Sequence, residues 1–164
     1  YELGAPNEYY KKFVPDGQKY ICADVSSRAE MFIDMTDMPF EDDSVDAFFS
    51  VYALEHVFAY RKALSEVMRT LKPGGRFLLF VPFTHYYHGA PDDYVRFTRS
   101  YLEKLFEGMS ILCASGIGNR MLCVAQMFHE KPFTGVTHSK YARLLYRFFA
   151  AACVSAYVWK SSQC

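Results

Sequence analysis

The strongest pattern in the chain is a pair of short apolar runs that flank an amphipathic segment. The runs at 47–52 and 76–82 have the length of strands, and 77–81 is apolar without a break, which is typical of a strand covered on both faces. Between them, apolar side chains recur at helical spacing and predict a helix over 58–71: Ala63, Leu64, Val67, Met68 and Leu71. The Lys-Pro-Gly-Gly run at 72–75 predicts a turn that ends this helix.

Shorter patterns extend this alternation in both directions. Strands are predicted at 19–25, 31–34 and 110–114, and helices at 7–13, 100–106, 120–128 and 138–160. Ser100 and Glu103 have the spacing of a capping box. The alternation predicts an α/β fold, a Rossmann-like and mostly parallel sheet with flanking helices. The first residues read as the end of a strand and no clear strand follows 115, so we expect a sheet shortened at its first strand and lacking its final edge strand.

Composition narrows the function classes. The chain has 164 residues, of which 51% are hydrophobic, and its 18 basic and 18 acidic residues balance without a basic block, so no nucleic-acid partner is predicted. Five scattered cysteines without a CxxC pair favour reduced thiols in a cytoplasmic protein, and no metal site is expected. The segment 141–159 is interrupted by Arg143 and Arg147. It predicts a helix packed on the domain, with an interfacial or partner-binding helix as the alternative and a membrane span not expected.

Polar groups follow the predicted strands at positions that suit a nucleotide-like ligand. The run from Glu2 to Pro6, with Gly4 at its centre, stands where a first strand meets a first helix. Asp24 ends the next strand, 20 residues after Gly4, which is the spacing of a ribose-binding acid. An ordinary turn and an exposed aspartate at a strand end are the alternative interpretation. The absence of an initiator methionine leads us to expect residues upstream of Tyr1.

Three blocks of the chain resemble the class I S-adenosylmethionine-dependent methyltransferases of the methyltransferase type 11 group. The resemblance extends from Glu2 to about Phe106. The blocks are Asp34-x-x-x-Met38-Pro39-Phe40-x-Asp42-x-Ser44-x-Asp46, then Leu54-Glu55-His56-Val57, then Arg69-x-Leu71-Lys72-Pro73-Gly74-Gly75. It implies one domain over 1–164, with a cofactor-binding core at 1–115 and a helical part at 116–164.

The resemblance also implies roles for individual residues. Glu2 and Gly4 would contact the methionine end of S-adenosylmethionine, and Asp24 would accept the ribose hydroxyls. Asp34 and Met35 would hold the adenine, and Tyr52 and Leu54 would line the sulfonium region, where an aromatic face attracts a cation. An acid at Glu2 would repel a pyrophosphate, which argues against a nicotinamide oxidoreductase. The family pattern has a second glycine where this chain has Pro6, so a non-catalytic interaction domain stays open as the second hypothesis.

The acceptor side is expected on the aromatic loop at 83–97 and the C-terminal helices. The predicted function is methyl transfer to an oxygen or nitrogen of a small or medium-sized acceptor. Candidates for a general base are His56, His85, His88 and Asp93. For His56 the alternative is a bond to a neighbouring group, and for His85 and His88 it is a solvated loop. For Asp93 the alternative is an ion pair with Arg96 that locks the loop.

Overall fold

The computed structural model describes residues 1–85, 87–89, 92–116, 118–121 and 123. These residues belong to two compact units. The first unit is formed by residues 1–82 and 89–97, and the second by residues 83–88 and those from 98 onward. The candidate site lies in the first unit, and each unit is described by itself below.

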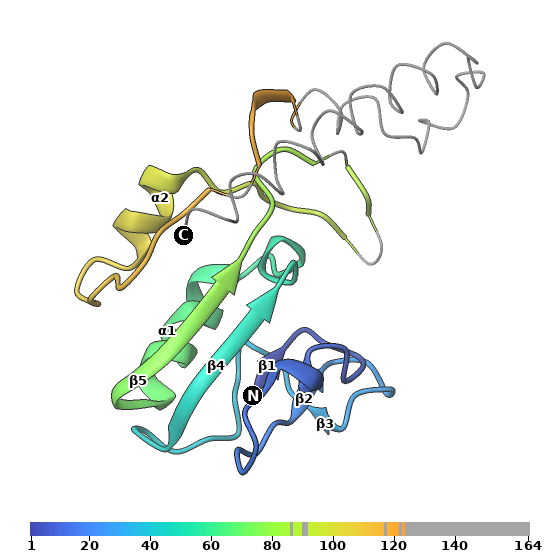
Figure 1. Ribbon diagram of the computed structural model, residues 1–164, viewed down its shortest axis with the longest axis vertical. Coiled ribbons are helices and arrows are strands. Elements are labelled where there is room, and N and C mark those ends of the chain that lie inside the picture. Colours follow the sequence, from blue (N-terminus) through green and yellow to red (C-terminus); the bar gives the residue numbers. More distant parts are fainter. Residues whose placement is uncertain (86, 90–91, 117, 122, 124–164) are drawn as a thin grey trace. The chain divides into compact units, whose positions relative to one another are not determined.

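A five-stranded sheet forms the centre of the first unit, and all its strand pairs are parallel (Figure 1). The strand order is β3-β2-β1-β4-β5. The strands are β1 (Glu2–Leu3), β2 (Cys22–Asp24), β3 (Met31–Phe32), β4 (Val45–Val51) and β5 (Leu71–Phe80). The predicted Rossmann-like parallel sheet is therefore confirmed, and its first three strands are much shorter than β4 and β5.

The helix α1 (Tyr60–Thr70) makes the crossover from β4 to β5. Three members of its predicted apolar stripe are buried, since Ala63, Leu64 and Val67 are at most 3% exposed. Met68 is instead 40% exposed, and Leu71 belongs to β5. Two short 3₁₀ turns complete the unit, η1 (Lys11–Phe13) in the segment after β1 and η2 (Leu54–His56) in the segment after β4. The short helix predicted at 7–13 is therefore reduced to a single turn, in agreement with Pro15 and Gly17 just beyond it.

The Lys-Pro-Gly-Gly run at 72–75 is predicted to form a turn between the helix and the next strand. It lies inside β5 instead. β5 begins at Leu71, directly after α1, and Leu71 pairs with Val45. The next pair is Ala47 with Arg76, so that one residue of β4 faces four residues of β5. Gly74 has a φ of +80° in this bulge, which explains the glycine.

Two further predictions about strands are wrong. β5 is not covered on both faces, because the side chain of Leu78 is 55% exposed and β5 is the edge strand of the described sheet. The segment 110–114 forms no strand, and Leu112 is 77% exposed. A short apolar run becomes a strand only by pairing with another strand, and no described strand pairs with this one.

In the second unit, α2 (Arg99–Leu105) is capped differently from the prediction. The Thr98 hydroxyl oxygen accepts a hydrogen bond from the Tyr101 N–H at 3.2 Å, so Thr98 and not Ser100 is the N-cap. Glu103 forms an ion pair with Arg99 at 2.7 Å instead of closing a capping box. Only Arg120, Met121 and Cys123 of the helix predicted at 120–128 are described, and they are helical, whereas 138–160 lies outside the described residues. None of the described helices has the length and apolar character needed to cross a bilayer.

Candidate cofactor site

The residues predicted to hold a cofactor come together at one edge of the sheet. In a parallel sheet the carboxyl ends of all strands meet at the same edge, where ligands of open α/β sheets bind. Gly4 directly follows β1, Asp24 is the last residue of β2, Asp34 follows β3 after one residue, and Tyr52 directly follows β4. The placement of these residues from predicted strand ends is therefore correct, and their individual roles remain predictions.

Gly4 turns the chain sharply at the exit of β1. Its φ is +80°, and a β-carbon at this position would lie 2.2 Å from the Cβ of Ala53. The N–H groups of Gly4 and Ala5 both donate to the carbonyl of Ala23, at 2.8 and 3.2 Å. The result is a narrow backbone turn between the exits of β2 and β4, which only glycine can form. A ligand can approach the main chain closely at such a turn.

Glu2 has a buried side chain at the start of the same strand. The residue is 3% exposed, and its carboxylate accepts a hydrogen bond from the hydroxyl of Tyr20. Burial raises the pKa of Glu2 to about 7. The carboxyl group can therefore change its charge near neutral pH, and a cation nearby would favour the ionised form.

Asp24 and Asp34 use their carboxylates in the same way. Oδ1 of Asp24 accepts the N–H of Ser26 at 2.6 Å, and Oδ1 of Asp34 accepts both the N–H and the hydroxyl of Thr36 at 2.8 Å. Each bond to a residue two positions ahead is a turn typical of aspartate. Among the described residues, neither second oxygen, Oδ2, accepts a hydrogen bond. Each aspartate is thus held by one oxygen and offers the other as an acceptor.

The predicted sulfonium-lining residues differ in what they expose. Tyr52 has a φ of +51°, and its ring is 58% exposed at the exit of β4. Its N–H donates to the carbonyl of Phe80 at 3.0 Å, so this uncommon backbone conformation is held by the neighbouring strand. Leu54 is completely buried, and Met35 is 6% exposed. These two side chains belong to the core, which leaves mainly their backbone atoms for a ligand.

The segment 92–97 packs against the turn η2 and fixes two of the predicted bases. Nδ1 of His56 lies against the carbonyl of Asp92, so Nδ1 carries a proton and donates it. The Tyr94 N–H donates to the carbonyl of Glu55 at 2.9 Å. Asp93 is paired with Arg96, which donates to both of its carboxylate oxygens, one at 2.6 Å, and the side chain of Asp93 is only 2% exposed. The predicted locking pair is confirmed.

His85 and His88 belong to the second unit, where their ring centroids are 4.7 Å apart. The two imidazoles contact each other edge to face. Their predicted role beside His56 stays a prediction.

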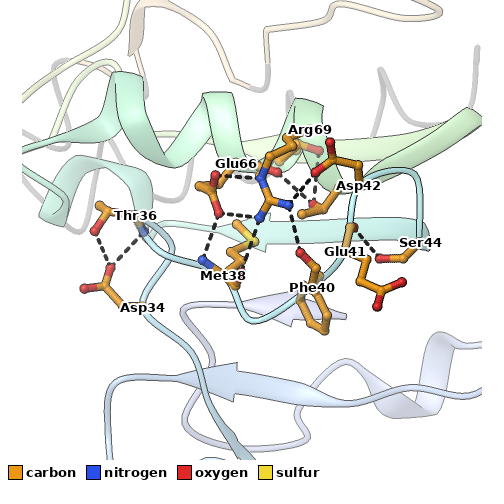
Figure 2. A network of polar contacts seen from close by, with 11 residues as sticks. Asp34, Thr36, Met38, Phe40, Glu41, Asp42, Ser44, Glu66 and Arg69 are labelled. Carbon is orange, nitrogen blue, oxygen red and sulfur yellow. Dashed lines mark hydrogen bonds and ion pairs between the residues drawn. The ribbon is translucent and has the colours of Figure 1, made fainter.

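A polar network joins α1 to the loop after β3 (Figure 2). Arg69 donates to the carbonyls of Phe40 at 2.8 Å and Met38 at 3.3 Å, and the Met38 N–H donates to Glu66 at 3.0 Å. Met38 and Phe40 belong to one motif block of the sequence, Arg69 belongs to another, and Glu66 belongs to none. No local pattern in the sequence predicts that they contact one another. The only signal is an arginine on a predicted helix and an acidic loop that could face it.

Comparisons with known proteins agree with this architecture. Residues 8–79 match the family model described as a methyltransferase domain. A demethylmenaquinone methyltransferase of Clavibacter sepedonicus is 50% identical over 46 residues, which are 28% of this chain and 19% of that protein. A sterol 4-C-methyltransferase of Caenorhabditis elegans is 33% identical over 64 residues, 38% of this chain and 19% of that protein. The chain therefore spans about a fifth of the length of these curated relatives.

A solved structure shows the same fold. It is a complex between the Haloferax volcanii Trm112 methyltransferase activator and a candidate methyltransferase, with 24% sequence identity and a TM-score of 0.51. The match covers 65% of this chain and 57% of that one. S-adenosylmethionine is the methyl donor that the matched family model and relatives imply. The parallel sheet and the match over residues 8–79 show that this part of the chain is similar to methyltransferase domains and has the fold of the class I, S-adenosylmethionine-dependent enzymes.

Proposed function

We propose that this protein binds S-adenosylmethionine at the carboxyl edge of its sheet and transfers the methyl group to a small or medium-sized acceptor. One observation carries the proposal. Asp24 and Asp34 each fix one carboxylate oxygen in a local turn and present the other at the edge where the main chain makes its narrow turn at Gly4. Two acceptors and a close backbone approach match a ligand with ribose hydroxyls, an adenine amino group and no pyrophosphate.

The other residues of the edge fit the charged end of this cofactor. When bound, S-adenosylmethionine supplies a methyl group activated by a positively charged sulfur. The exposed ring of Tyr52 would face that charge, because aromatic faces attract cations. Glu2 would lie toward the ammonium group of the methionine part, and that cation would keep the carboxylate ionised below its pKa of about 7. Both roles place negative or polarizable groups where the cofactor is positive.

On the acceptor side, His56 is the best candidate for a base. The carbonyl of Asp92 holds the proton on Nδ1, so Nε2, which lies 4.0 Å from Oε1 of the buried Glu55, would be the ring nitrogen that takes a proton from an acceptor group. Asp93 is a poor base, because its carboxylate is buried and paired with Arg96. Asp93 would instead hold the segment 92–97 in place beside His56. Transfer itself needs alignment of the nucleophile with the methyl carbon and the sulfur.

We propose oxygen or nitrogen as the acceptor atom, although a base alone does not select it, because methylation at oxygen, nitrogen or carbon releases a proton in each case. The name of the sterol 4-C-methyltransferase adds carbon as an alternative atom. A panel of phenol, amine and quinol-type acceptors, with products analysed by mass spectrometry and NMR, distinguishes the three. Methylation only at ring carbon would contradict the oxygen or nitrogen proposal and leave cofactor binding untouched.

The second hypothesis is a methyltransferase-like interaction domain that has lost the cofactor. It is favoured by Pro6, which removes a backbone donor from the turn after Gly4. Isothermal titration with S-adenosylmethionine separates the two. We expect binding by the unmodified protein, a loss of about tenfold or more in D24A and D34A, and no change in D16A, an exposed aspartate elsewhere in the first unit. An absence of binding at millimolar cofactor would exclude the catalytic function.

A further inference from the structure

The last turn of α1 carries an ion pair that faces the loop after β3. Arg69 donates through Nε and Nη2 to the two carboxylate oxygens of Glu66, at 2.9 and 2.7 Å. Hydrogen bonds from Arg69 lower the pKa of Glu66 to about 2, and the same bonds raise the pKa of Arg69. Both groups are therefore charged at neutral pH, and the pair is a fixed two-pronged contact and not a pH-dependent one.

This pair holds the main chain of the loop more than its side chains. The Arg69 guanidinium donates to the carbonyls of Met38 and Phe40, and Glu66 accepts the N–H of Met38 (Figure 2). Three backbone groups between 38 and 40 are thus bonded to two side chains of one helix turn. Arg69 also pairs with Asp42 at 2.8 Å, but the Asp42 side chain is 75% exposed, and exposed pairs contribute little.

The clamped part of the loop is directly connected to Asp34. The Asp37 N–H donates to the carbonyl of Asp34 at 3.1 Å, and Thr36 donates to its carboxylate. Met35 and Met38 are buried at 6% and 4% exposure, which anchors the loop on both sides of Thr36. The turn from Asp34 to Met38 is therefore closed by its own hydrogen bonds at one end and bonded to α1 at the other. A shift of Met38 would displace the carboxylate of Asp34.

We infer that Arg69 and Glu66 are positioning residues that fix the loop from Asp34 to Asp42 in the shape that binds the adenine end of the cofactor. The inference rests on the proposed function, because it needs Asp34 to face the adenine. It also gives a physical reason why the motif block from Asp34 to Asp46 and the block that begins at Arg69 occur in one chain. The arginine belongs to the same site as the aspartate, although it lies 35 positions later.

The experiment compares S-adenosylmethionine, adenosine and methionine by isothermal titration in R69M, R69K and E66Q. Replacement of Arg69 by methionine removes every bond that Arg69 donates and keeps an unbranched aliphatic side chain, while the bond from the Met38 N–H to Glu66 remains possible. We expect about tenfold weaker binding of S-adenosylmethionine and of adenosine in R69M, the loss of about one charge-assisted bond, with methionine binding unchanged. R69K should be intermediate, because an ammonium group cannot donate to a carboxylate and two carbonyls as a planar guanidinium does. K72M, which removes the exposed Lys72–Asp46 pair, is the matched control and should bind all three ligands normally.

Amide hydrogen exchange of Met38 provides a second readout that a general loss of stability would not mimic. Faster exchange at Met38 in E66Q, with the amides of β4 and β5 unchanged, is the expected result. Adenosine binding by folded R69M within twofold of the unmodified protein would overturn the inference. An equal loss of adenosine and methionine binding would also overturn it. A failure of the unmodified protein to bind S-adenosylmethionine would instead count against the proposed function.

Discussion

Gly4 and Ala53 approach so closely that a β-carbon on Gly4 would lie 2.2 Å from the Cβ of Ala53. The exits of β1 and β4, 49 positions apart in the chain, therefore share one space with room for a single β-carbon. This contact explains the glycine better than backbone conformation alone. Gly17 has nearly the same positive φ, +83°, with nothing within 4 Å of its would-be β-carbon.

The two glycines allow the steric and conformational costs to be separated. We expect G4A to lower the free energy of unfolding by about 3 kcal/mol or more, because it combines overpacking with a left-handed φ. G17A should lower it by about 1 kcal/mol, since only the conformational cost applies. Urea denaturation of both variants measures the difference. The double variant G4A/A53G should recover part of the loss, and equal losses in the two single variants would refute the steric explanation.

Glu2 predicts a pH dependence of stability with an unusual sign. Its pKa is raised to about 7 in the folded protein by burial, whereas an unfolded glutamate ionises near its ordinary value of 4.5. Between these values the unfolded chain has lost a proton that the folded protein keeps, so this group makes stability fall as the pH rises from about 4.5 to 7. Above about pH 7 its contribution is constant. Urea denaturation at a series of pH values measures the slope.

Two variants test whether this slope belongs to Glu2. E2Q should remove it, because glutamine does not titrate. E8Q should keep it, because Glu8 is exposed and forms a surface ion pair with Lys11. Y20F removes the hydroxyl that donates to Glu2 and should raise the pKa further, which extends the slope to higher pH. An unchanged slope in E2Q would assign the effect to another group.

The pair of Asp93 and Arg96 predicts a large effect of single substitutions. Asp93 is 2% exposed, so R96M would leave a buried carboxylate without its guanidinium, and we expect a loss of about 3–5 kcal/mol in the free energy of unfolding. D93N/R96M should recover part of this loss, because position 93 no longer carries a buried charge. Chemical denaturation of the two variants provides the comparison. A double variant no more stable than R96M would argue that the charge is not the cause.

The N-cap of α2 predicts a smaller and local effect. T98A removes the hydroxyl that accepts the Tyr101 N–H and should destabilise the helix by about 1 kcal/mol. S100A should have almost no effect, because Ser100 lies inside the helix and does not cap it. Amide exchange at Tyr101 reports on both. Faster exchange in S100A than in T98A would restore the predicted capping box.

The parts of the fold that depend on local patterns were predictable from the sequence. The helix predicted at 58–71 is observed as Tyr60–Thr70, because its apolar stripe follows the helical repeat. The start of β5 was not predictable, because it depends on the pairing of Leu71 with Val45, which are far apart in the chain. The N-cap of α2 was missed for a local reason. Thr98 has the extended backbone that a cap needs, with φ −78° and ψ 155°, and this conformation is not visible in residue types.

In the candidate site, too, the features set by local sequence were predictable and those set by long-range contacts were not. Gly4, Asp24 and Asp34 could be placed because strand ends were readable and parallel strands share an edge. The contacts that orient them could not be predicted. The bond from Tyr20 to Glu2 and the bonds from Arg69 to the loop after β3 join residues that only the folded chain brings together. How deeply each of these side chains is buried is likewise decided only when the sheet is assembled.

The unequal strand lengths have a consequence for dynamics. β1, β2 and β3 have only two or three residues each, whereas β4 and β5 have seven and ten. A ladder of so few backbone bonds opens at low free energy, so the half of the sheet that carries Gly4, Asp24 and Asp34 should exchange its amide protons sooner than the other half. A molecule bound across the three exits would stabilise this half by mass action. In that case a ligand would connect the three short strands, and the protection of their amides from exchange would increase with the concentration of the ligand.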